Sequence, residues 1–483
     1  MKIILITPPY HSGIPELAGR WIPLGLVYLA GAARQAGLSV EIYDAMAKDH
    51  GWAEIGERLG ASRPDYVATS AITATVGDAL KTLELAKRIN PRAVTILGGV
   101  HASFMYEEIL SSSEAVDYIV IGEGELSLRQ LLGVLEQGGD PSTVPGLAYR
   151  QGEAIVTTPP RPLARDLDQL PAAWDLLDWP DYQYFVIPGS RFGAVSTSRG
   201  CEEHCGFCSQ QRFWGRSWRG RDPQKVADEL EELYRRYQVN VFMITDEHAS
   251  RDRGRWEALL DALIAKELPL NLIMETRVPD VIRDRDIFWK YRKAGIVHVS
   301  LGIESASQEQ LDRLGKNARV DQVKEALDII HAHDMVSEAS FLVGFPEETV
   351  ESVKATLKLA QYYNPDNANF LPVTPWPYSE LYAELKPYIR EWDYSKYNLI
   401  ESIVEPRQMS RRQLDVAIVD CFRKFNMGKI PETMMMKDTF RRGYIMRTTK
   451  LIMGSSFIMK KLSLGTLNKI PAKIEEVAQK FKG

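Results

Sequence analysis

The sequence predicts an α/β protein with two parallel sheets in succession and a helical C-terminal region. Short apolar segments that end in glycine, serine, threonine or aspartate alternate with amphipathic segments over residues 1–145 and again over residues 191–385. The intervening residues 146–190 are rich in proline and acidic residues, which indicates a linker. The alternation then stops, and residues 386–483 show helical patterns.

The first sheet is expected from five apolar strands. They lie at residues 2–7, 39–43, 66–70, 93–97 and 116–121. Helical segments near residues 23–36 and 77–89 separate some of them, so the strands should run parallel. This order is typical of a Rossmann-like domain, in which ligands bind at the carboxyl ends of the strands and glycines let the backbone approach closely.

The second sheet is expected from six further strands. They lie at residues 194–198, 239–245, 270–275, 296–301, 338–343 and 368–373. A helix should begin at Asp222 and Pro223, which suit the N-cap and the first helical position. Six parallel strands with outer helices indicate a partial (β/α)6 TIM barrel, whose active site lies at the C-terminal ends of the strands.

Charge, cysteine content and hydrophobicity limit the functional class. The formal net charge of −5 gives no electrostatic reason to expect a nucleic-acid partner. Four cysteines in 483 residues do not make a disulfide framework, which favours a reducing cytoplasm. The N-terminal apolar run stops at Pro8 and is typical of a strand rather than a signal peptide. No apolar run approaches the roughly 18 residues of a membrane span.

Three cysteines lie together after the first strand of the second sheet. Cys201, Cys205 and Cys208 follow a C-x3-C-x2-C spacing, and three such thiolates can hold a four-iron cluster with one iron left open. The alternatives are three unligated core thiols or a structural zinc site. Zinc usually takes four Cys or His ligands in paired spacing. The remaining cysteine, Cys421, is remote in the sequence, and His204 lies between two cysteines at a spacing unlike the zinc patterns.

This spacing, with the aromatic Phe207 before the third cysteine, resembles the signature of the radical S-adenosylmethionine (SAM) superfamily. The resemblance implies a 4Fe-4S cluster whose open iron chelates SAM, and cleavage of SAM to a 5′-deoxyadenosyl radical by one electron. It also implies SAM contacts from residues of this loop and of the strand ends: Phe207, Asp246, Glu247, Arg277, Gly302, Glu304 and Gly344. Acidic groups and an arginine suit a zwitterionic sulfonium, although each alone is equally consistent with a structural ion pair.

The N-terminal part resembles the cobalamin-binding domain that precedes the radical SAM domain in a large subfamily. The order of the strand-end fragments carries the resemblance, and it implies these cobalamin-binding residues: Pro23, Leu24, Gly25, Thr69, Ser70, Gly98, Gly99, Val100, His101, Gly122, Glu123, Gly124 and Glu125. The chain has no D-x-H-x-x-G motif, so the resemblance implies a base-off cobalamin without a protein histidine on cobalt, or one with a different neighbour on its lower face. The alternative is a domain that binds nothing and only packs.

Two histidines are candidates for a catalytic proton donor or a metal ligand. They are His204 on the cysteine loop and His248 directly after the acidic pair at 246–247. The alternative for each is a structural histidine with satisfied hydrogen bonds. The sequence assigns no other catalytic residue.

The C-terminal residues 386–483 are expected to form a helical cap over the active site. A helix should begin near Arg411, and methionine-rich apolar segments with an excess of basic residues follow from Lys437 onward. Methionines adapt to irregular apolar surfaces, so a dimer face is an alternative. A basic amphipathic stretch can also lie on a membrane, which would place a cytoplasmic enzyme at a membrane surface. The sequence leaves the oligomeric state open.

Further segments closely resemble the anaerobic magnesium-protoporphyrin IX monomethyl ester oxidative cyclase family. They include His11-Ser12-Gly13, Phe213-Trp214, Arg221-Asp222-Pro223 and Thr374-Pro375-Trp376-Pro377. The resemblance implies that the radical abstracts hydrogen from the methylpropionate side chain of a magnesium porphyrin. Oxidation, water addition and ring closure would then form the isocyclic ring of the chlorophylls and bacteriochlorophylls.

The same resemblance implies a reductant such as flavodoxin or ferredoxin, and a cobalamin that accepts or relays an electron. The alternative enzyme is a cobalamin-dependent radical SAM C-methyltransferase that acts on an unactivated carbon. A third hypothesis is a cobalamin or iron-sulfur sensor without enzymatic activity. A sensor has no need for acidic residues at successive barrel-strand ends, so the sequence favours an enzyme.

Overall fold

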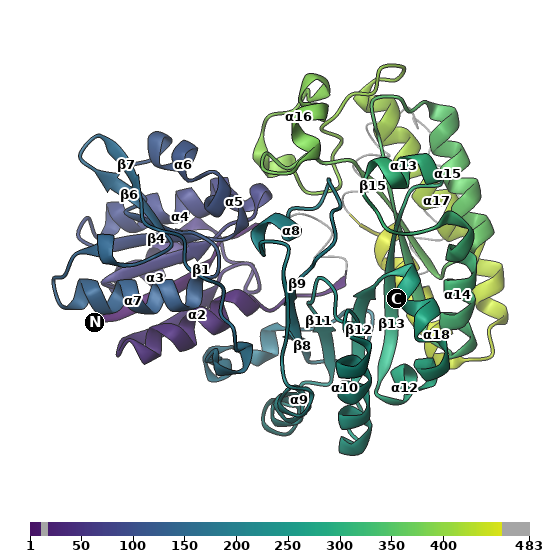
Figure 1. Ribbon diagram of the computed structural model, residues 1–483, viewed down its shortest axis with the longest axis horizontal. Coiled ribbons are helices and arrows are strands. Elements are labelled where there is room, and N and C mark those ends of the chain that lie inside the picture. Colours follow the sequence, from purple (N-terminus) through teal and green to yellow (C-terminus); the bar gives the residue numbers. More distant parts are fainter. Residues whose placement is uncertain (11–17, 456–483) are drawn as a thin grey trace.

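The computed structural model describes residues 1–10 and 18–455, which form two sheets and a group of C-terminal helices (Figure 1). The N-terminal sheet has the strand order β2-β1-β3-β4-β5-β6-β7. Its strands are β1 (Lys2–Thr7), β2 (Ser39–Asp44), β3 (Tyr66–Ser70), β4 (Val94–Gly98), β5 (Tyr118–Val120), β6 (Leu147–Gln151) and β7 (Ala154–Thr157). Strands β1 to β5 pair in parallel, which confirms the Rossmann-like sheet.

Helices cover both faces of this sheet because successive residues of a strand face opposite sides. Ile4 and Ile6 of β1 pack with one pair of helices, and Ile3 and Leu5 pack with another pair. The first pair is α3 (Trp52–Ser62) and α4 (Val76–Ile89), and the second is α2 (Leu24–Gln35) and α7 (Gly124–Glu136). The short helices α5 (Val100–Phe104) and α6 (Tyr106–Ser112) lie between β4 and β5. The loops at the carboxyl ends of the strands are thereby left free for a ligand.

The prediction of a linker over residues 146–190 is wrong for its first part. Strands β6 and β7 form an antiparallel hairpin that extends the N-terminal sheet beyond β5. Gly152, with a φ of 64°, lies in the turn between them. These two strands have only five and four residues, so the alternation of apolar and polar residues along them is not recognisable in the sequence. The segment that follows buries aromatic side chains in the core of the second sheet: Trp174, Trp179, Tyr182 and Tyr184.

The second sheet is an open barrel of six parallel strands in the order β15-β14-β13-β12-β11-β8. They are β8 (Phe192–Val195), β11 (Val241–Ile244), β12 (Asn271–Thr276), β13 (Ile296–Glu304), β14 (Val336–Val343) and β15 (Asn367–Pro372). The helices of this part are α9 (Pro223–Tyr237), α10 (Arg253–Lys266), α11 (Val278–Arg283), α12 (Phe288–Lys293), α13 (Gln308–Arg313), α14 (Val323–Ala332) and α15 (Val350–Tyr363). The Asp222 side chain caps α9, as predicted, and the strand set confirms the partial (β/α)6 TIM barrel.

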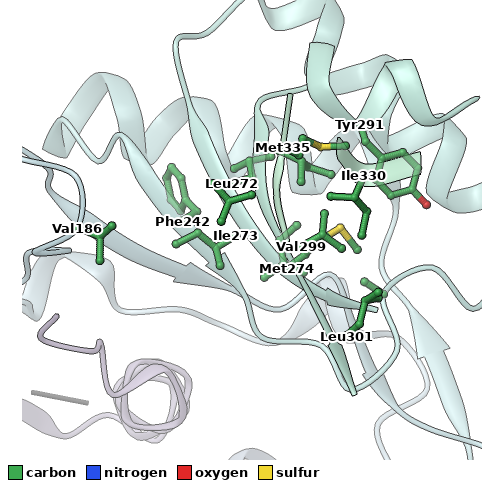
Figure 2. Packing of buried hydrophobic residues seen from close by; sticks show 14 of the residues in the cluster. Val186, Phe242, Leu272, Ile273, Met274, Tyr291, Val299, Leu301, Ile330 and Met335 are labelled. Carbon is green, nitrogen blue, oxygen red and sulfur yellow. The ribbon is translucent and has the colours of Figure 1, made fainter. Parts of the chain in front are cut away.

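The core of the barrel lies between the outward faces of the strands and the helices. Figure 2 shows Met274 of β12 and Val299 of β13 close to Ile330 of α14. The next residue along each of these two strands, Glu275 and Ser300, is polar and lines a cavity inside the barrel. This period of two places an apolar face toward the helices and a polar face toward the barrel interior.

Helix α17 (Arg411–Met435) covers the open edge of the barrel beside β15 (Figure 1). Helix α18 (Thr439–Met453) packs against α17 and β14. The short helix α16 (Leu381–Leu385) lies instead beside the cysteine loop, where the backbone N–H of Leu381 donates to the Gly206 carbonyl oxygen at 3.0 Å. The ring of Phe425 on α17 lies 6.4 Å from the ring of Phe370 on β15. Among the described residues, no helix is long and apolar enough to span a membrane. The last part of the predicted cap, residues 456–483, and the segment His11-Ser12-Gly13 lie outside the described residues.

Replacing Phe425 by alanine is expected to lower the free energy of unfolding by about 3–5 kcal/mol, because this fully buried ring fastens α17 to β15. The matched control is Met427→Ala on the same helix, where the side chain is 54% exposed and the expected change is below about 0.5 kcal/mol. Urea unfolding followed by circular dichroism measures both. Equal midpoints for the two variants would contradict this packing.

Candidate active site

The cysteine loop starts at a close approach between two backbone segments. Strand β9 (Ser198–Gly200) pairs antiparallel with β10 (Trp218–Gly220), so the segment between them, which includes α8 (Gln210–Phe213), forms a closed loop. Gly200 has a φ of 95°, and a Cβ atom there would lie 2.0 Å from the Ser217 carbonyl oxygen. Only glycine fits this position, so the backbone fixes where Cys201 begins.

Residues that follow the barrel strands hold the loop from outside. The backbone N–H of Gly206 donates to the Leu314 carbonyl oxygen at 2.9 Å. Gly315 leaves space for the His204 carbonyl oxygen, which would lie 2.5 Å from a Cβ atom at position 315. Phe207 packs against a small hydrophobic cluster that includes Leu314, Phe345 and Val373. The segments after β13, β14 and β15 therefore position the loop.

The three loop thiols are half-buried and free of disulfides. Burial raises the pKa of each, to about 11 for Cys205, and the cations Lys316 and Arg277 counteract part of this rise at Cys205. Iron binds the thiolate, and the positive charge of a bound iron centre would compensate the negative charge that burial disfavours. Within residues 1–10 and 18–455, no three His, Cys, Asp or Glu side chains are grouped to hold one metal ion.

The acidic pair after β11 holds the two ends of the loop. Asp246 accepts three hydrogen bonds of 2.5–2.7 Å from residues 197–198, and burial raises its pKa to about 6. Glu247 accepts hydrogen bonds from the backbone N–H of Gly200 at 3.0 Å and from Trp214 Nε1 at 2.6 Å. Both carboxylates orient the loop. The expected contact of either one with the SAM ammonium group stays a prediction.

A buried ion pair lies on the opposite side of the loop. Glu304 ends β13 at a β-bulge with a φ of 64°, and its Oε1 accepts a hydrogen bond from Lys316 Nζ at 2.9 Å. Burial would lower the pKa of Lys316, but the Glu304 carboxylate outweighs it and raises that pKa. A Cβ atom at Gly302 would lie 2.4 Å from Glu304 Oε1, so the glycine makes room for the pair. Sequence reasoning missed Lys316, because no motif marks it.

Two further predicted SAM residues lie at strand ends. Arg277, after β12, forms an ion pair with Glu203 of the cysteine loop and donates to the Asn317 carbonyl oxygen at 2.9 Å. Gly344, after β14, has a φ of 95°, and a Cβ atom there would lie 2.6 Å from Leu414 Cδ2 of α17. The barrel thus brings Arg277, Gly302, Glu304 and Gly344 to the rim that carries the loop. Their contacts with SAM stay predictions.

The histidines singled out from the sequence lie in three different environments. His204 is exposed on the loop. His248 is buried, with Nε2 2.5 Å from Asp280 Oδ2 and with no hydrogen-bond partner for Nδ1 among the described residues, and its catalytic role stays a prediction. His101 is buried with Nδ1 3.1 Å from Thr73 Oγ1, and burial lowers its pKa to about 4.

A cavity of about 280 Å³ lies between the N-terminal sheet and the cysteine loop. The predicted cobalamin residues on its wall are Leu24, Gly25, Thr69, Ser70, Gly98, Gly99, Gly122, Glu123, Gly124 and Glu125. The other three, Pro23, Val100 and His101, do not line it. Its opposite wall comes from the barrel: Ser196, Ser198, Arg199, Phe213, Trp214, Thr245 and Glu247. The two sheets therefore share one cavity next to the cluster loop.

Glycines shape this first cavity. Gly25 and Gly122 line the cavity, and a Cβ atom built at either position would have no other atom within 4 Å. A larger side chain at these positions would therefore extend into the open space of the cavity. Gly99 has a φ of 95°, and a Cβ atom there would lie 2.5 Å from the Ala71 carbonyl oxygen. Strand ends lined by bare backbone suit the nucleotide tail of a large cofactor, so the residues on this wall fit that part of cobalamin.

A buried arginine joins the two walls of the first cavity. Arg199 precedes Gly200 on β9 and is 11% exposed, with Nη1 3.0 Å from Glu123 Oε1 and Nη2 2.7 Å from Glu125 Oε1. Glu123 also pairs with Arg219, and these arginines lower its pKa although burial acts in the opposite direction. The Arg199 guanidinium lies over the Trp214 ring, 5.8 Å from its centre. Sequence reasoning assigned both glutamates to the cobalamin and missed their arginine partner.

A second cavity of about 310 Å³ lies inside the barrel. Inward side chains of β12 to β15 form a polar wall: Glu275, His298, Ser300, Glu338, Ser340, Asn367 and Asn369. Helices α17 and α18 contribute an apolar wall: Ile418, Phe422, Leu451 and Ile452. None of these residues is in the set predicted from the sequence. The signal that could have found the polar ones is their alternation with core residues along each strand.

The sequence and the fold together define the class of protein. The B12 binding domain family matches residues 11–132, and the Radical SAM superfamily matches residues 195–360. The radical S-adenosylmethionine methyltransferase TsrM from Kitasatospora setae has the same fold, with a TM-score of 0.67 at 20% identity over 80% of this chain and 75% of that one. The cobalamin-dependent S-adenosylmethionine radical enzyme OxsB superposes with a TM-score of 0.71 at 15% identity, over 100% of this chain and 75% of that one. The protein is a cobalamin-dependent radical SAM enzyme with a 4Fe-4S cluster.

More similar relatives identify the family. The anaerobic magnesium-protoporphyrin IX monomethyl ester cyclase of Rubrivivax gelatinosus is 38% identical over 96% of this chain and 84% of that protein. The enzyme of the same name from Cereibacter sphaeroides is 38% identical over 93% of this chain and 74% of that protein. An uncharacterized methyltransferase of Pyrococcus horikoshii is 30% identical over 92% of this chain and 96% of that protein. The chain belongs to the family of the anaerobic magnesium-protoporphyrin IX monomethyl ester cyclases, which confirms the resemblance seen in its sequence.

Replacing Cys201, Cys205 or Cys208 by alanine is expected to remove most of the bound iron, because a cluster held by three thiolates tolerates no missing ligand. Iron and sulfide content after anaerobic reconstitution measures this. Cys421→Ala is the control, since that thiol is buried on α17 with the Val353 carbonyl oxygen 3.9 Å away. Equal iron loss in all four variants would contradict the assignment of the loop cysteines.

Arg199→Ala is expected to lower the amount of bound cobalamin and to destabilise the protein by about 3–5 kcal/mol, because Glu125 becomes an unpaired buried charge. The control is Arg216→Ala, whose partner Glu380 is equally exposed, and it should change stability by less than about 1 kcal/mol. The cobalamin absorbance per protein and the thermal unfolding midpoint are the measurements. A wild-type cobalamin content and a wild-type unfolding midpoint in Arg199→Ala would show that the two walls of the first cavity stay together without this arginine.

Proposed function

We propose that the protein catalyses the oxygen-independent oxidative cyclisation of magnesium-protoporphyrin IX monomethyl ester, which forms the isocyclic ring of the chlorophylls and bacteriochlorophylls. One observation carries this proposal. The 38% identity to two cyclases extends over 96% and 93% of this chain, so it includes both sheets, the cysteine loop and the residues of both cavities. Similarity that reflects only shared cofactors would be concentrated at the cofactor sites.

The two cavities support a reaction in which two cofactors serve one substrate. In this proposal the first cavity holds cobalamin, and Cys201, Cys205 and Cys208 hold the cluster between the cavities. The second cavity holds the substrate, because its apolar wall suits the face of a macrocycle and its polar wall suits propionate and ester groups. SAM bound at the cluster supplies a 5′-deoxyadenosyl radical. The walls of the barrel cavity would surround that radical and limit its contact with bulk water.

The residues proposed to contact SAM surround the loop. They are Phe207, Asp246, Glu247, Arg277, Gly302, Glu304 and Gly344. The acidic groups would accept the ammonium group of SAM, and Arg277 would pair with its carboxylate. His204 remains a proposed proton donor at the loop. An external reductant such as flavodoxin or ferredoxin is part of the proposal, because the cluster needs one electron for each cleavage of SAM.

The second candidate function is a C-methyltransferase. The uncharacterized methyltransferase of Pyrococcus horikoshii favours it, because the 30% identity extends over 96% of that protein. The hopanoid C-3 methylase of Methylococcus capsulatus is 27% identical over 80% of this chain. The same two cavities would serve methyl transfer, with the methyl group coming from the cobalamin side.

Products of a single set of incubations separate the two functions. The anaerobically reconstituted enzyme is mixed with SAM, a reductant and magnesium-protoporphyrin IX monomethyl ester, and the nucleoside and porphyrin products are analysed by mass spectrometry. The cyclase should give 5′-deoxyadenosine and a porphyrin that has gained one oxygen and lost four hydrogens. Cys205→Ala is the matched inactive control, because it lacks one proposed cluster ligand.

S-adenosylhomocysteine formed in step with a porphyrin that has gained a CH2 unit would instead establish the methyltransferase. Formation of 5′-deoxyadenosine with the porphyrin left unchanged would reject this substrate.

A further inference from the structure

The polar wall of the barrel cavity carries two carboxylates at the same level. Glu275 of β12 and Ser300 of β13 are register partners, and Ser300 and Glu338 of β14 are partners in turn. All three side chains line the cavity. Partners at one level of a parallel sheet project from the same face, so both carboxylates face the interior space that we assign to the substrate.

Neighbouring side chains restrain Glu338. The Ser300 hydroxyl donates to its Oε1 at 3.2 Å, and His298 Nε2 lies 3.7 Å from its Oε2. The His298 ring is held in turn, because its Nδ1 lies 2.7 Å from the Tyr444 hydroxyl, which lies 2.6 Å from the Tyr184 hydroxyl. Glu338 is therefore a fixed part of the wall.

Glu275 differs from Glu338 in having no hydrogen bond or ion pair with any residue of the ranges 1–10 and 18–455. Its side chain is exposed, and the space that it reaches is the barrel cavity. The walls of this cavity remove water from around the Glu275 carboxyl and so raise its pKa, the carboxylates of Glu338, Glu304 and Glu247 add to this rise, and Lys316 opposes it. An unpaired carboxylate that faces the substrate cavity and has a raised pKa is suited to accept a proton.

Glu275 also lies at the end of the cavity nearest the cysteine loop. It is the fifth residue of β12, and Arg277, two residues further along the chain, pairs with Glu203 of the loop. Lys316 acts electrostatically on both Glu275 and Cys205. The carboxylate is therefore close to the place where the radical forms.

We propose that Glu275 is the base that accepts the proton of the water molecule that adds to the substrate. This assignment rests on the proposed function. Hydrogen abstraction leaves a carbon radical on the substrate. This radical would give one electron to an acceptor such as cobalamin and would thereby become a carbocation. The water oxygen then forms the new C–O bond. One O–H bond of that water breaks, and the Glu275 carboxylate takes the proton and becomes a carboxylic acid.

The variant Glu275→Gln tests this role, because the amide keeps the size of the side chain but cannot take the proton. The probe is magnesium-protoporphyrin IX monomethyl ester deuterated on the methylpropionate, added to the reconstituted holoenzyme. We expect the spectrum of the bound porphyrin and deuterium transfer into 5′-deoxyadenosine to persist, while the oxygenated product falls by about 10²–10⁴-fold. Glu275→Asp should recover part of the loss.

The pH profile gives an independent measurement. Formation of oxygenated product by the wild type should fall as the pH drops through the pKa of Glu275, since only the carboxylate accepts a proton, and Glu275→Gln should lose this limb. Glu351→Gln, an exposed residue on the outer helix α15, is the control and should retain the wild-type profile.

Two outcomes separate this assignment from the proposed function. A wild-type rate of oxygenated product in Glu275→Gln, or a parallel loss of deuterium transfer and product, overturns the role of Glu275 and leaves the proposed function standing. Absence of deuterium transfer in the wild type overturns the proposed function, and the role of Glu275 with it.

Discussion

The arrangement of the whole protein depends on one buried ionic contact, that of Arg199 with Glu123 and Glu125. The arginine lies on the strand that leads into the cysteine loop, and both glutamates lie at the carboxyl edge of the N-terminal sheet. Buried charges need well-placed partners, because a buried arginine or glutamate without its partner loses its hydration and gains no ionic contact in return. The contact therefore fixes the cysteine loop against the glycine-lined cavity, and the distance between the two cofactor sites follows from it.

The cysteine loop is positioned from the other side by the barrel. Asp246 holds the strand that leads into it, Glu247 contacts both Gly200 at its start and Trp214 near its end, and the segments after β13 to β15 hold its middle. A loop of three cysteines has little structure of its own, so its geometry comes from these neighbours. This explains why acidic residues at strand ends, whose expected role was SAM binding, are also bonded to the loop. One carboxylate can orient the loop and still present charge to a ligand beside it.

The barrel interior shows how one strand supplies both stability and a site. Met274 and Val299 face the helices and belong to the hydrophobic core, whereas Glu275 and Ser300, one residue further on, face the cavity. Helices α17 and α18 close the open side of this cavity with apolar side chains. The position of these helices gives the cavity two chemically different walls, which suits a substrate with an apolar ring and polar substituents. The expected cap over the active site stays a prediction.

Much of the fold and part of the site could be predicted from the sequence alone, because they depend on local pattern. The period of each strand, the Asp222 cap, the cysteine spacing and the glycine-tipped strand ends are all encoded within a few residues. The hairpin of β6 and β7 is also local, but its strands are too short to show a clear pattern in the sequence. The place of His101 away from the first cavity, and the partners Arg199, Lys316 and Glu275, were decided only by the tertiary structure. Each of these three partners acts on residues far apart from it in the chain, whose charges and side chains meet only when the elements of the fold pack together.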